Sequence, residues 1–240
     1  MCDDHFHDEL SRRKAIQIAG SAALVGISGL LFPNSASAAS SGADISHGPR
    51  TRPEVALTFH GAGDLVIARK ILAIAKKTKT PITVMAVGVW LHANPGIGRE
   101  ILNGGHDLGN HTYSHKPMTS LSFKEAKLEI VKGQDALIKS VGTKGNWFRP
   151  SGTQKSNAII RAAAGSAGYG HCISFDLDPL DYQNPSPKTI VSNCTRAVQN
   201  GSIISLHFGH AHTLTALPLI IQALHARKLT PVTISTLLRA

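Results

Sequence analysis

The sequence predicts an α/β protein in which parallel strands alternate with helices that cover the outside of one sheet. From Glu54 onward, seven short apolar runs, partly β-branched and bounded by Gly, Pro or Asn, alternate with longer stretches of helical periodicity. The chain has 240 residues, 42% of them hydrophobic, which is enough for one sizeable domain with a buried core. Right-handed crossovers allow such a set of strands to close into a barrel.

The predicted strands are all short and the helices between them longer. The strands cover residues 55–59, 82–88, 106–110, 146–150, 172–176, 202–206 and 230–234. The helices cover residues 64–77, 98–102, 122–142, 156–167, 187–199 and 214–226. The clearest helix opens with Ser122 and Glu125, the spacing of a capping box, and keeps one apolar face until Gly142.

Residues 1–38 predict an export signal that is not part of the fold. Arg12 and Arg13 precede an apolar run rich in Ala and Gly, and Ala36-Ser37-Ala38 supplies a cleavage site. Paired arginines before such a run resemble a twin-arginine signal, so we expect a protein that is secreted or held at the cell wall. The alternative interpretation is a single N-terminal membrane anchor.

A linker and one domain are expected after the signal. Residues 39–53 are small, polar and punctuated by Pro and Gly, which predicts a linker, and residues 54–240 form the domain. No later stretch is apolar and long enough to span a bilayer. We expect a monomer, and no disulfide between Cys172 and Cys194, which fall in a predicted strand and a predicted helix.

The charge of the chain favours an anionic partner. A formal net charge of +10 would draw an exported protein to an anionic surface such as a cell wall. Scattered lysines and only 5% aromatic residues argue against nucleic acid as the partner.

Polar side chains follow five of the seven predicted strands. Chemistry in parallel barrels collects at the carboxyl ends of the strands, so we expect these side chains to converge. His111 and His115 lie four residues apart, and either a helical turn or a tight loop leaving a strand would place both imidazoles beside one divalent cation. The set comprises His60 and Asp64, His111 and His115, Arg149, Asp178 and Asp181, and His207.

The ordered set resembles the polysaccharide deacetylases of carbohydrate esterase family 4, the NodB-like fold, over residues 54–238. The matching segments are His111-Thr112-Tyr113-Ser114-His115, Phe148-Arg149-Pro150-Ser151-Gly152, Asp178-Pro179-Leu180-Asp181-Tyr182 and Leu206-His207. The resemblance implies a deformed (β/α)₇ barrel that binds a divalent metal, of which Zn²⁺ is the expected one. It also implies removal of N- or O-acetyl groups from chitin-like or peptidoglycan-like glycans, a hydrolysis of non-peptide C–N bonds.

The resemblance further implies a role for each matched residue. His111 and His115 would bind the metal, and His207 would be the general acid. Arg149 would orient a catalytic carboxylate, and the backbone near Gly152 would donate to the oxyanion. Asp181 would steer either His207 or the arginine. Tyr182 is a further candidate, as a ring that stacks on the sugar.

The first family motif departs from the pattern. The family reads Thr-Phe-Asp-Asp-Gly, with the first Asp as general base and the second as metal ligand, whereas this chain reads Thr58-Phe59-His60-Gly61. Three arrangements follow. Asp64 completes the metal site while His60 acts as base or as a further ligand. In the second arrangement His60 binds the metal beside the other two histidines. In the third, catalysis is lost.

We expect a secreted, metal-dependent deacetylase from these observations, with His60 catalytic and Asp64 a ligand. The alternative is a non-catalytic carbohydrate-binding protein on the same barrel. A hydrolase of small non-peptide amides is a third possibility.

Overall fold

Five parallel strands form the sheet of the computed structural model, which describes residues 42–239. The predicted signal lies outside the described residues. Strand order is β3-β2-β1-β4, and β5 pairs with the start of β1. The strands are β1 (Glu54–Gly61), β2 (Thr83–Ala86), β3 (Asp107–Asn110), β4 (Ile203–His207) and β5 (Thr230–Val232). The predicted parallel α/β fold is therefore confirmed.

Two of the predicted strands are reduced to isolated bridges. Phe148 bridges both Asn110 of β3 and Cys172, and Leu177 bridges Ile204 of β4, in each case in parallel. These bridges connect β3 to residues 148 and 172, and residue 177 to β4, and we call the strands together with these bridging segments the ring. Pro150 has no N–H group, which helps to end pairing just after Phe148.

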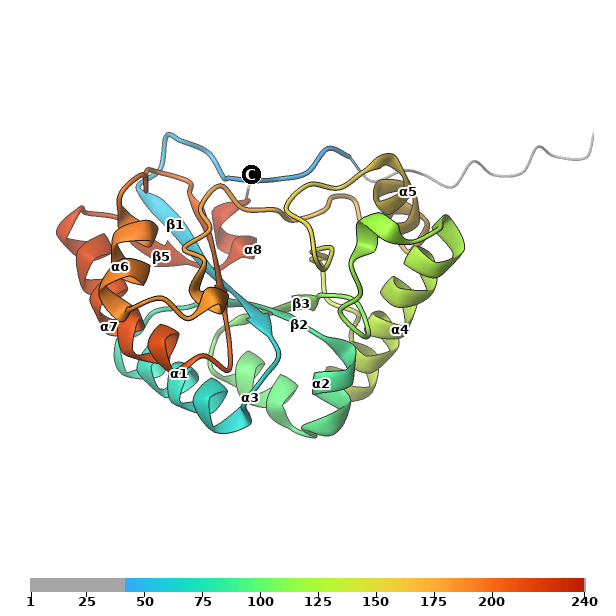
Figure 1. The fold of residues 1–240 in the computed structure, drawn as a ribbon, viewed down its shortest axis with the longest axis horizontal. Helices are drawn as coiled ribbons and strands as arrows, with labels where there is room; N and C mark the ends of the chain where they lie inside the picture. The colour runs from blue at the N-terminus through green and yellow to red at the C-terminus, as the bar shows by residue number, and fades with distance from the viewer. Residues whose placement is uncertain (1–41, 240) are drawn as a thin grey trace, which may run out of the picture. The chain divides into compact units, whose positions relative to one another are not determined.

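Helices cover the outside of this sheet (Figure 1). All six predicted helices are present, although α6 ends four residues earlier than expected and α7 begins three residues earlier. The sequence pattern misses α2 because its start continues the apolar run of β2. The helices are α1 (Leu65–Lys77), α2 (Gly88–Ala93), α3 (Ile97–Asn103), α4 (Phe123–Val141), α5 (Ala158–Ser166), α6 (Pro187–Thr195), α7 (Ala211–Ala226) and α8 (Ile234–Leu237).

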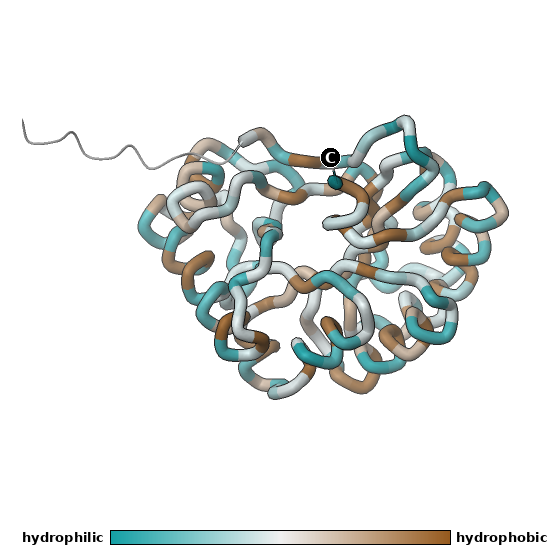
Figure 2. The backbone as a smooth tube through the Cα atoms, turned by 180° about the vertical axis from the view of Figure 1, so that it is seen from behind, coloured by the Kyte–Doolittle hydropathy of each residue, from teal (hydrophilic) through white to brown (hydrophobic). Residues whose placement is uncertain are grey.

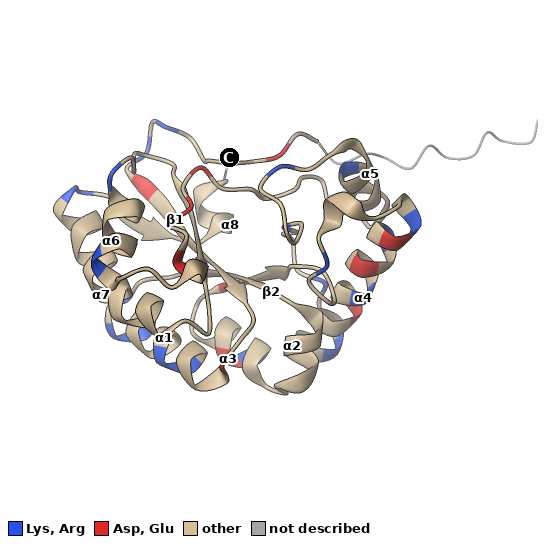
Figure 3. Cartoon of the chain, viewed as in Figure 1, with Lys and Arg blue, Asp and Glu red and all other residues tan. Residues whose placement is uncertain are grey.

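The helices bury one face and expose the other. Figure 2 shows hydrophobic and hydrophilic stretches alternating along them, and Figure 3 shows Lys and Arg spread over the outer helices and loops. The capping box of α4 is formed, because the Ser122 N–H donates to Glu125 Oε2 at 2.9 Å. Cys194 of α6 is a buried thiol that forms no disulfide with Cys172. Within residues 42–239, no helix combines the length and apolarity of a membrane span.

Strand β1 lies at the centre of the sheet and its side chains alternate between two environments. Val55, Leu57 and Phe59 pack into the large core under the helices. Thr58 and His60 lie on the opposite face, toward the interior of the ring, as the two-residue period of a strand requires. Because of this alternation, the His60 side chain lies on the inner face of the sheet at the carboxyl end of β1.

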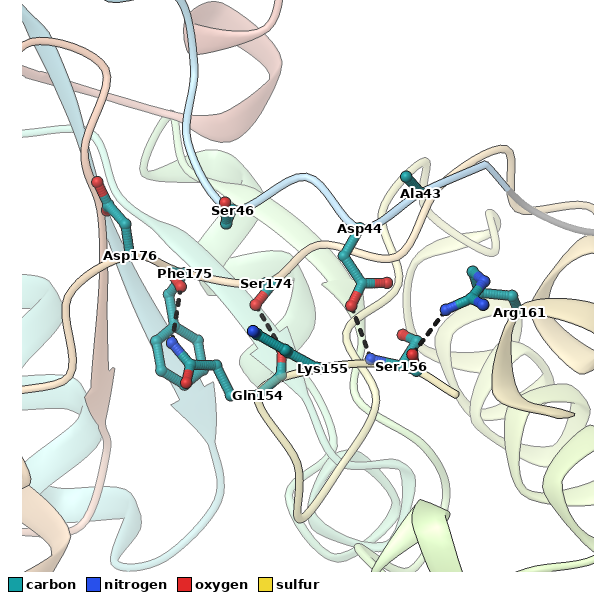
Figure 4. A pocket seen from close by; sticks show the side chains of 10 residues that line it. All are labelled: Ala43, Asp44, Ser46, Gln154, Lys155, Ser156, Arg161, Ser174, Phe175 and Asp176. Atoms are coloured by element: carbon teal, nitrogen blue, oxygen red, sulfur yellow. Dashed lines mark hydrogen bonds between the residues drawn. The ribbon is translucent and has the colours of Figure 1, made fainter. Parts of the chain in front are cut away.

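Residues 42–53 are part of the fold, which corrects the linker prediction for the described part of that segment. Ile45 bridges Ile173, and the Gly48 N–H donates to the Gly201 carbonyl at 2.7 Å. Arg50 forms an ion pair with Asp176 at 2.8 Å. We call residues 42–53 the strap. Its composition resembles a linker, but backbone pairs and the side chains of Asp44, Arg50 and Arg52 join it to segments that are distant in the sequence (Figure 4 shows the hydrogen bond between Ser156 and Asp44).

Candidate active site

Three histidines meet at the carboxyl end of the sheet. His60 comes from β1, whereas His111 and His115 follow β3 on a tight loop, one of the two conformations that their spacing allows. Thr112 and His115 have φ angles of 65° and 58°, a left-handed conformation that is uncommon outside glycine. The ring centroids of His111 lie 4.2 Å from His60 and 4.9 Å from His115. One ring nitrogen of each histidine lies within 4.8 Å of the other two.

The loop that carries His111 and His115 is fixed by α4. Asn110 accepts from the Thr112 N–H at 2.9 Å and donates to the Ile130 carbonyl of α4 at 2.9 Å. The buried Glu129 carboxylate of α4 accepts from the N–H of Ser114 at 2.8 Å and from its hydroxyl at 2.7 Å. These contacts hold a backbone conformation that would otherwise be unfavourable.

Hydrogen bonds determine which histidine nitrogens are available. His111 Nδ1 lies 2.8 Å from the Arg149 carbonyl, which can only accept, so Nδ1 carries the proton and Nε2 presents its lone pair. That Nε2 lies 3.0 Å from His60 Nδ1. His60 Nε2 in turn lies 3.1 Å from the Ser205 hydroxyl. The serine can donate to or accept from His60, so His60 can release Nδ1 for a metal without losing its partner.

Burial keeps these imidazoles neutral. Desolvation lowers the pKa of His60 and of His111 well below the usual histidine value, and charges on neighbouring histidines lower it further. Desolvation also lowers the pKa of the more exposed His115. Neutral imidazole is the form that binds metals, and a backbone carbonyl on the second nitrogen of His111 is typical of a histidine ligand. The three residues therefore fit a zinc-class ion.

His207 and Asp181 form a second functional unit beside the histidine cluster. His207 Nδ1 lies 2.7 Å from Asp181 Oδ1, and the fully buried Asp181 also accepts from the His207 N–H at 2.9 Å and the Thr213 hydroxyl at 2.6 Å. The His207 ring lies 4.1 Å from that of His60, centroid to centroid. The sequence left open whether Asp181 steers His207 or Arg149, and the structure shows it in contact with His207.

Arg149, which the resemblance expects to orient a catalytic carboxylate, makes no hydrogen bond to a carboxylate within the described chain. Its guanidinium is buried and, within the described chain, donates only to the Ile173 and Ser174 carbonyls and the Thr58 hydroxyl, at 3.2, 3.1 and 2.8 Å. Burial lowers the pKa of Arg149 to about 9, an effect that the charge of Asp178 opposes. The family's catalytic carboxylate is a histidine in this chain, so the arginine contacts backbone carbonyls instead.

Asp64 lies apart from the histidine cluster, which corrects its assignment as a metal ligand. Its side chain is exposed and caps α1, where Oδ1 accepts from the N–H groups of Val66 and Ile67 at 2.7 and 3.0 Å. Aspartate is a favoured N-cap residue because it satisfies the otherwise unpaired first N–H groups of a helix. The flexible glycines before Asp64 are thus used to start α1.

A cavity of about 460 Å³ opens beside His60, His115 and His207. Gly152 lines it with a φ of 66°, and Tyr182, 46% exposed, lies edge-on to the His207 ring at 5.2 Å. Five predicted site residues thus line the cavity, and His111 and Asp181 contact two of them. Arg149 is buried and contacts His111, whereas Asp64 is not among these residues. The remaining lining residues are Thr153, Gln154, Phe175, Asp178 and Ser205.

Sequence reasoning missed three contributors to the site. Ser205 lies two residues before His207 on β4, and the strand period could have placed it on the same face. Thr213 contacts Asp181 from the first turn of α7, and Glu129 reaches the histidine loop from α4. No local sequence pattern points to Thr213 or Glu129, because each makes its contact with a segment that is distant in the sequence.

Comparison with known proteins places the chain in a family. Its parallel fold, with histidines and acidic residues at the strand ends, is that of the NodB-type carbohydrate esterases of family 4. A model of the polysaccharide deacetylase family matches residues 47–171, so the chain belongs to this family.

Relatives from several bacteria are similar over most of the chain. A peptidoglycan-N-acetylglucosamine deacetylase of Bacillus cereus is 29% identical, over 80% of this chain and 91% of the relative. A family 4 carbohydrate esterase of Streptomyces lividans, solved with acetate, is 30% identical, with a TM-score of 0.69 over 76% of this chain and 93% of its own. A family 4 pseudoenzyme of Bacillus anthracis is 25% identical, with a TM-score of 0.78 over 83% of this chain and 70% of its own. A variant of that pseudoenzyme is described as having restored enzymatic activity.

Proposed function

We propose that this protein is a metal-dependent hydrolase that removes acetyl groups from an N-acetylated glycan, such as a chitin-like chain or peptidoglycan. The clustering of His60, His111 and His115 beside a cavity lined by His60, His115 and His207 carries the proposal. The relatives named as deacetylases support an acetylated glycan as the substrate.

The three histidines would hold the metal. A bound zinc-class ion supplies Lewis acidity and lowers the pKa of a bound water from 15.7 to about 7. The Arg149 carbonyl fixes the tautomer of His111, and Ser205 supports His60. With His60 among the ligands, neither His60 nor the distant Asp64 is free to act as general base.

Proton transfer then falls to two other residues that line the cavity, Asp178 and His207. Asp178 is the carboxylate among the described lining residues, and burial raises its pKa, which suits a base that takes a proton from the attacking water. His207 holds Asp181 through Nδ1, which leaves Nε2 to protonate the leaving amine, and Asp181 stabilises the imidazolium form. Gly152 and Tyr182 also line the cavity, and we assign them contacts with the acetyl group and the sugar.

A second candidate function is glycan binding without catalysis. The two carboxylates of the family's first motif are absent at His60 and Gly61, and a family 4 pseudoenzyme has the same fold. The two functions share the cavity and differ in whether a metal is bound and acetate is released.

The test measures both quantities on the purified protein. We expect one zinc per chain by mass spectrometry and acetate release from an N-acetylglucosamine hexamer. His60→Gln loses the zinc and the activity, whereas the matched change His92→Gln at an exposed site on α2 loses neither. Asp178→Asn keeps the zinc and slows acetate release by about 10²–10⁴-fold.

Two results would contradict this proposal. Binding of the hexamer without zinc or acetate release would establish the non-catalytic function. Full activity in His60→Gln would show that the metal site is assigned wrongly.

We also propose that the protein is exported by the twin-arginine route and acts outside the cell, near an anionic wall surface. The support is the Arg12-Arg13 pair and the net charge of +10. Replacing both arginines with lysine should retain the protein inside the cell in a fractionation experiment. Recovery of the unaltered protein in the membrane fraction would favour the anchor.

A further inference from the structure

A groove between helices α1 and α3 lies away from the histidine cluster. It encloses about 500 Å³, within the range of about 300–1,000 Å³ that is usual for small-molecule sites. Leu72, Ala73 and Lys76 of α1 line one side, and His106 lines it from the start of β3. Because His106 precedes β3 and His111 follows it, the groove lies toward the amino ends of the parallel strands.

His106 brings a buried hydrogen-bond donor to this groove. The residue is only 6% exposed, and its Nδ1 lies 3.3 Å from the Ile82 backbone nitrogen, which can only donate. Nδ1 is therefore the acceptor, and the proton of the neutral imidazole is on Nε2. Burial lowers the pKa of His106, which favours this neutral form although the charge of Asp107 opposes the effect. Within residues 42–239, no side chain or carbonyl accepts from Nε2.

Gly104 keeps the Nε2 edge of His106 open. A Cβ at position 104 would lie 2.9 Å from both Nε2 and Cδ2 of the ring, closer than such atoms pack. Gly104 has a φ of −75° and a ψ of −3°, which any residue can adopt, so the backbone does not require glycine here. Gly105, with a φ of 78°, differs in this respect. The missing side chain at Gly104 thus leaves Nε2 accessible from the groove that both residues line.

The charges in the groove favour an anion. Glu100 is the acidic residue among the described lining residues, and Arg69 holds its carboxylate through two contacts at 3.0 and 2.6 Å. That negative charge is already paired, whereas the Lys76 ammonium has no ion pair within the described chain. One free ammonium and one N–H donor suit a ligand with a single negative charge and two acceptor oxygens.

We propose that the groove between α1 and α3 binds a small carboxylate that carries a short apolar group. The carboxylate oxygens accept from His106 Nε2 and Lys76 Nζ, and the apolar group contacts Leu72 and Ala73. This ligand differs from the glycan of the candidate active site, and the proposal does not depend on the proposed function.

The experiment is a titration of the purified protein with butyrate, followed by nuclear magnetic resonance. We expect saturable shifts of the His106 ring nitrogens and of the Gly104 and Gly105 amides. His106→Phe keeps a ring and removes the donor, which should weaken butyrate binding by about tenfold, the loss of one hydrogen bond to a charged group. Lys76→Met keeps the apolar stem and removes the charge, which should weaken binding by about two- to fivefold, as for an exposed ion pair.

Lys77→Met is the matched control, because Lys77 is the next residue of α1, is equally exposed and does not line the groove. It should bind butyrate as the unaltered protein does. Butyramide, which has the same carbon chain without the charge, should bind at least about tenfold more weakly. Lys76→Met is exposed and should fold normally, so it remains a test even if His106→Phe does not fold.

Three results would overturn the proposal. The first is the absence of saturable shifts with butyrate, and the second is equal affinity for butyrate and butyramide. The third is tighter binding of inorganic phosphate than of butyrate, which would show that the groove selects charge without using its apolar wall.

Discussion

Position 61 shows at the residue scale why this chain does not carry the family's metal carboxylate. Gly61 is buried, and a Cβ placed there would lie 2.8 Å from Val84 Cγ1 and 3.0 Å from the Ala86 Cα. The second contact is with the backbone of β2, which cannot move aside as a side chain can. In the proposed metal site, the third ligand is the imidazole of His60, which lies on the other face of β1.

Restoring aspartate at this position should therefore harm the protein. We expect Gly61→Asp to lower the free energy of unfolding by about 1–3 kcal/mol, as overpacking does, and to bring no gain in zinc affinity. Gly170→Asp is the matched control, because a Cβ at Gly170 meets nothing within 4 Å. Urea unfolding and zinc titration measure the two effects. Tighter zinc binding at unchanged stability would show that β2 yields and that the family's arrangement is accessible.

The buried histidines make the metal-free protein sensitive to acid. Burial lowers the pKa of His60 and His111 below the value of 6.5 that applies to the unfolded chain. Below pH 6.5 the unfolded chain therefore binds more protons than the folded one, and stability falls as the pH decreases toward the folded pKa values. Above pH 6.5 both states are neutral and the stability is constant with respect to these groups.

We expect the free energy of unfolding in a chelator to fall between pH 7 and pH 5, by up to about 1.4 kcal/mol per pH unit for each histidine. Urea unfolding at several pH values measures this slope. His60→Gln should reduce the slope, and the exposed His92→Gln should not. A slope of the opposite sign would show that the cluster is protonated in the folded state.

At the scale of the single element, helix α4 holds the loop that carries His111 and His115. Glu129 is only 6% exposed and accepts two hydrogen bonds from Ser114, the residue before His115. The Glu129 carboxylate makes no hydrogen bond to the three clustered histidines but holds the left-handed turn on which the position of His115 depends. Helix α4 thus connects packing on the outside of the sheet to the geometry of the cavity.

Glu129→Ala should lower the zinc affinity by about tenfold, in the range found for residues that orient ligands. Competition with a chromophoric chelator measures the affinity, and circular dichroism checks that α4 remains helical. Asp135→Asn, on the exposed side of the same helix, is the control. Equal affinities in the unaltered protein and Glu129→Ala would mean that the loop holds its conformation unaided.

Elements encoded by local patterns could be predicted from the sequence. In α4, a capping box marks the start and a helical apolar periodicity continues to Gly142. In β1, a short apolar run marks the whole strand. The runs 146–150 and 172–176 are equally apolar but form only bridges, because pairing depends on neighbouring segments that a local pattern does not describe. The linker prediction for the strap was wrong for the same reason, because its contacts join it to segments that are distant in the sequence.

Individual site residues could be predicted when the strand order determined their position. His60, His111 and His207 lie at strand ends, and a parallel sheet brings strand ends together. The sequence offered two roles for Asp64, metal ligand and N-cap of α1, and the prediction chose the first. In the structure its carboxylate caps α1, where it accepts from the N–H groups of two residues that follow it closely in the chain. Glu129 and Thr213 depend on how helices pack, which no spacing rule specifies.

Arg149 joins three parts of the ring at the scale of the whole molecule. Its guanidinium spans the Thr58 hydroxyl of β1 and the Ile173 and Ser174 carbonyls, while its own carbonyl holds His111. The strap bridges Ile173 from outside, so one buried side chain links the centre of the sheet to the segments that replace two strands. The planar fork of arginine reaches all three acceptors, which a lysine ammonium on a single stem cannot do.

Arg149→Lys should therefore destabilise the protein although the charge is kept. We expect a loss of about 2–4 kcal/mol in urea unfolding, since leaving a buried polar group unpaired costs about 1–3 kcal/mol and at least one acceptor loses its donor. The control is Arg69→Lys, an exposed pair with Glu100 at 2.6 Å, which should change stability far less because water solvates both groups. Equal stability of Arg149→Lys and Arg69→Lys would show that the backbone bridges alone hold these segments together. A large loss confined to Arg149→Lys would show that the buried guanidinium holds β1 and the segment around Ile173 together.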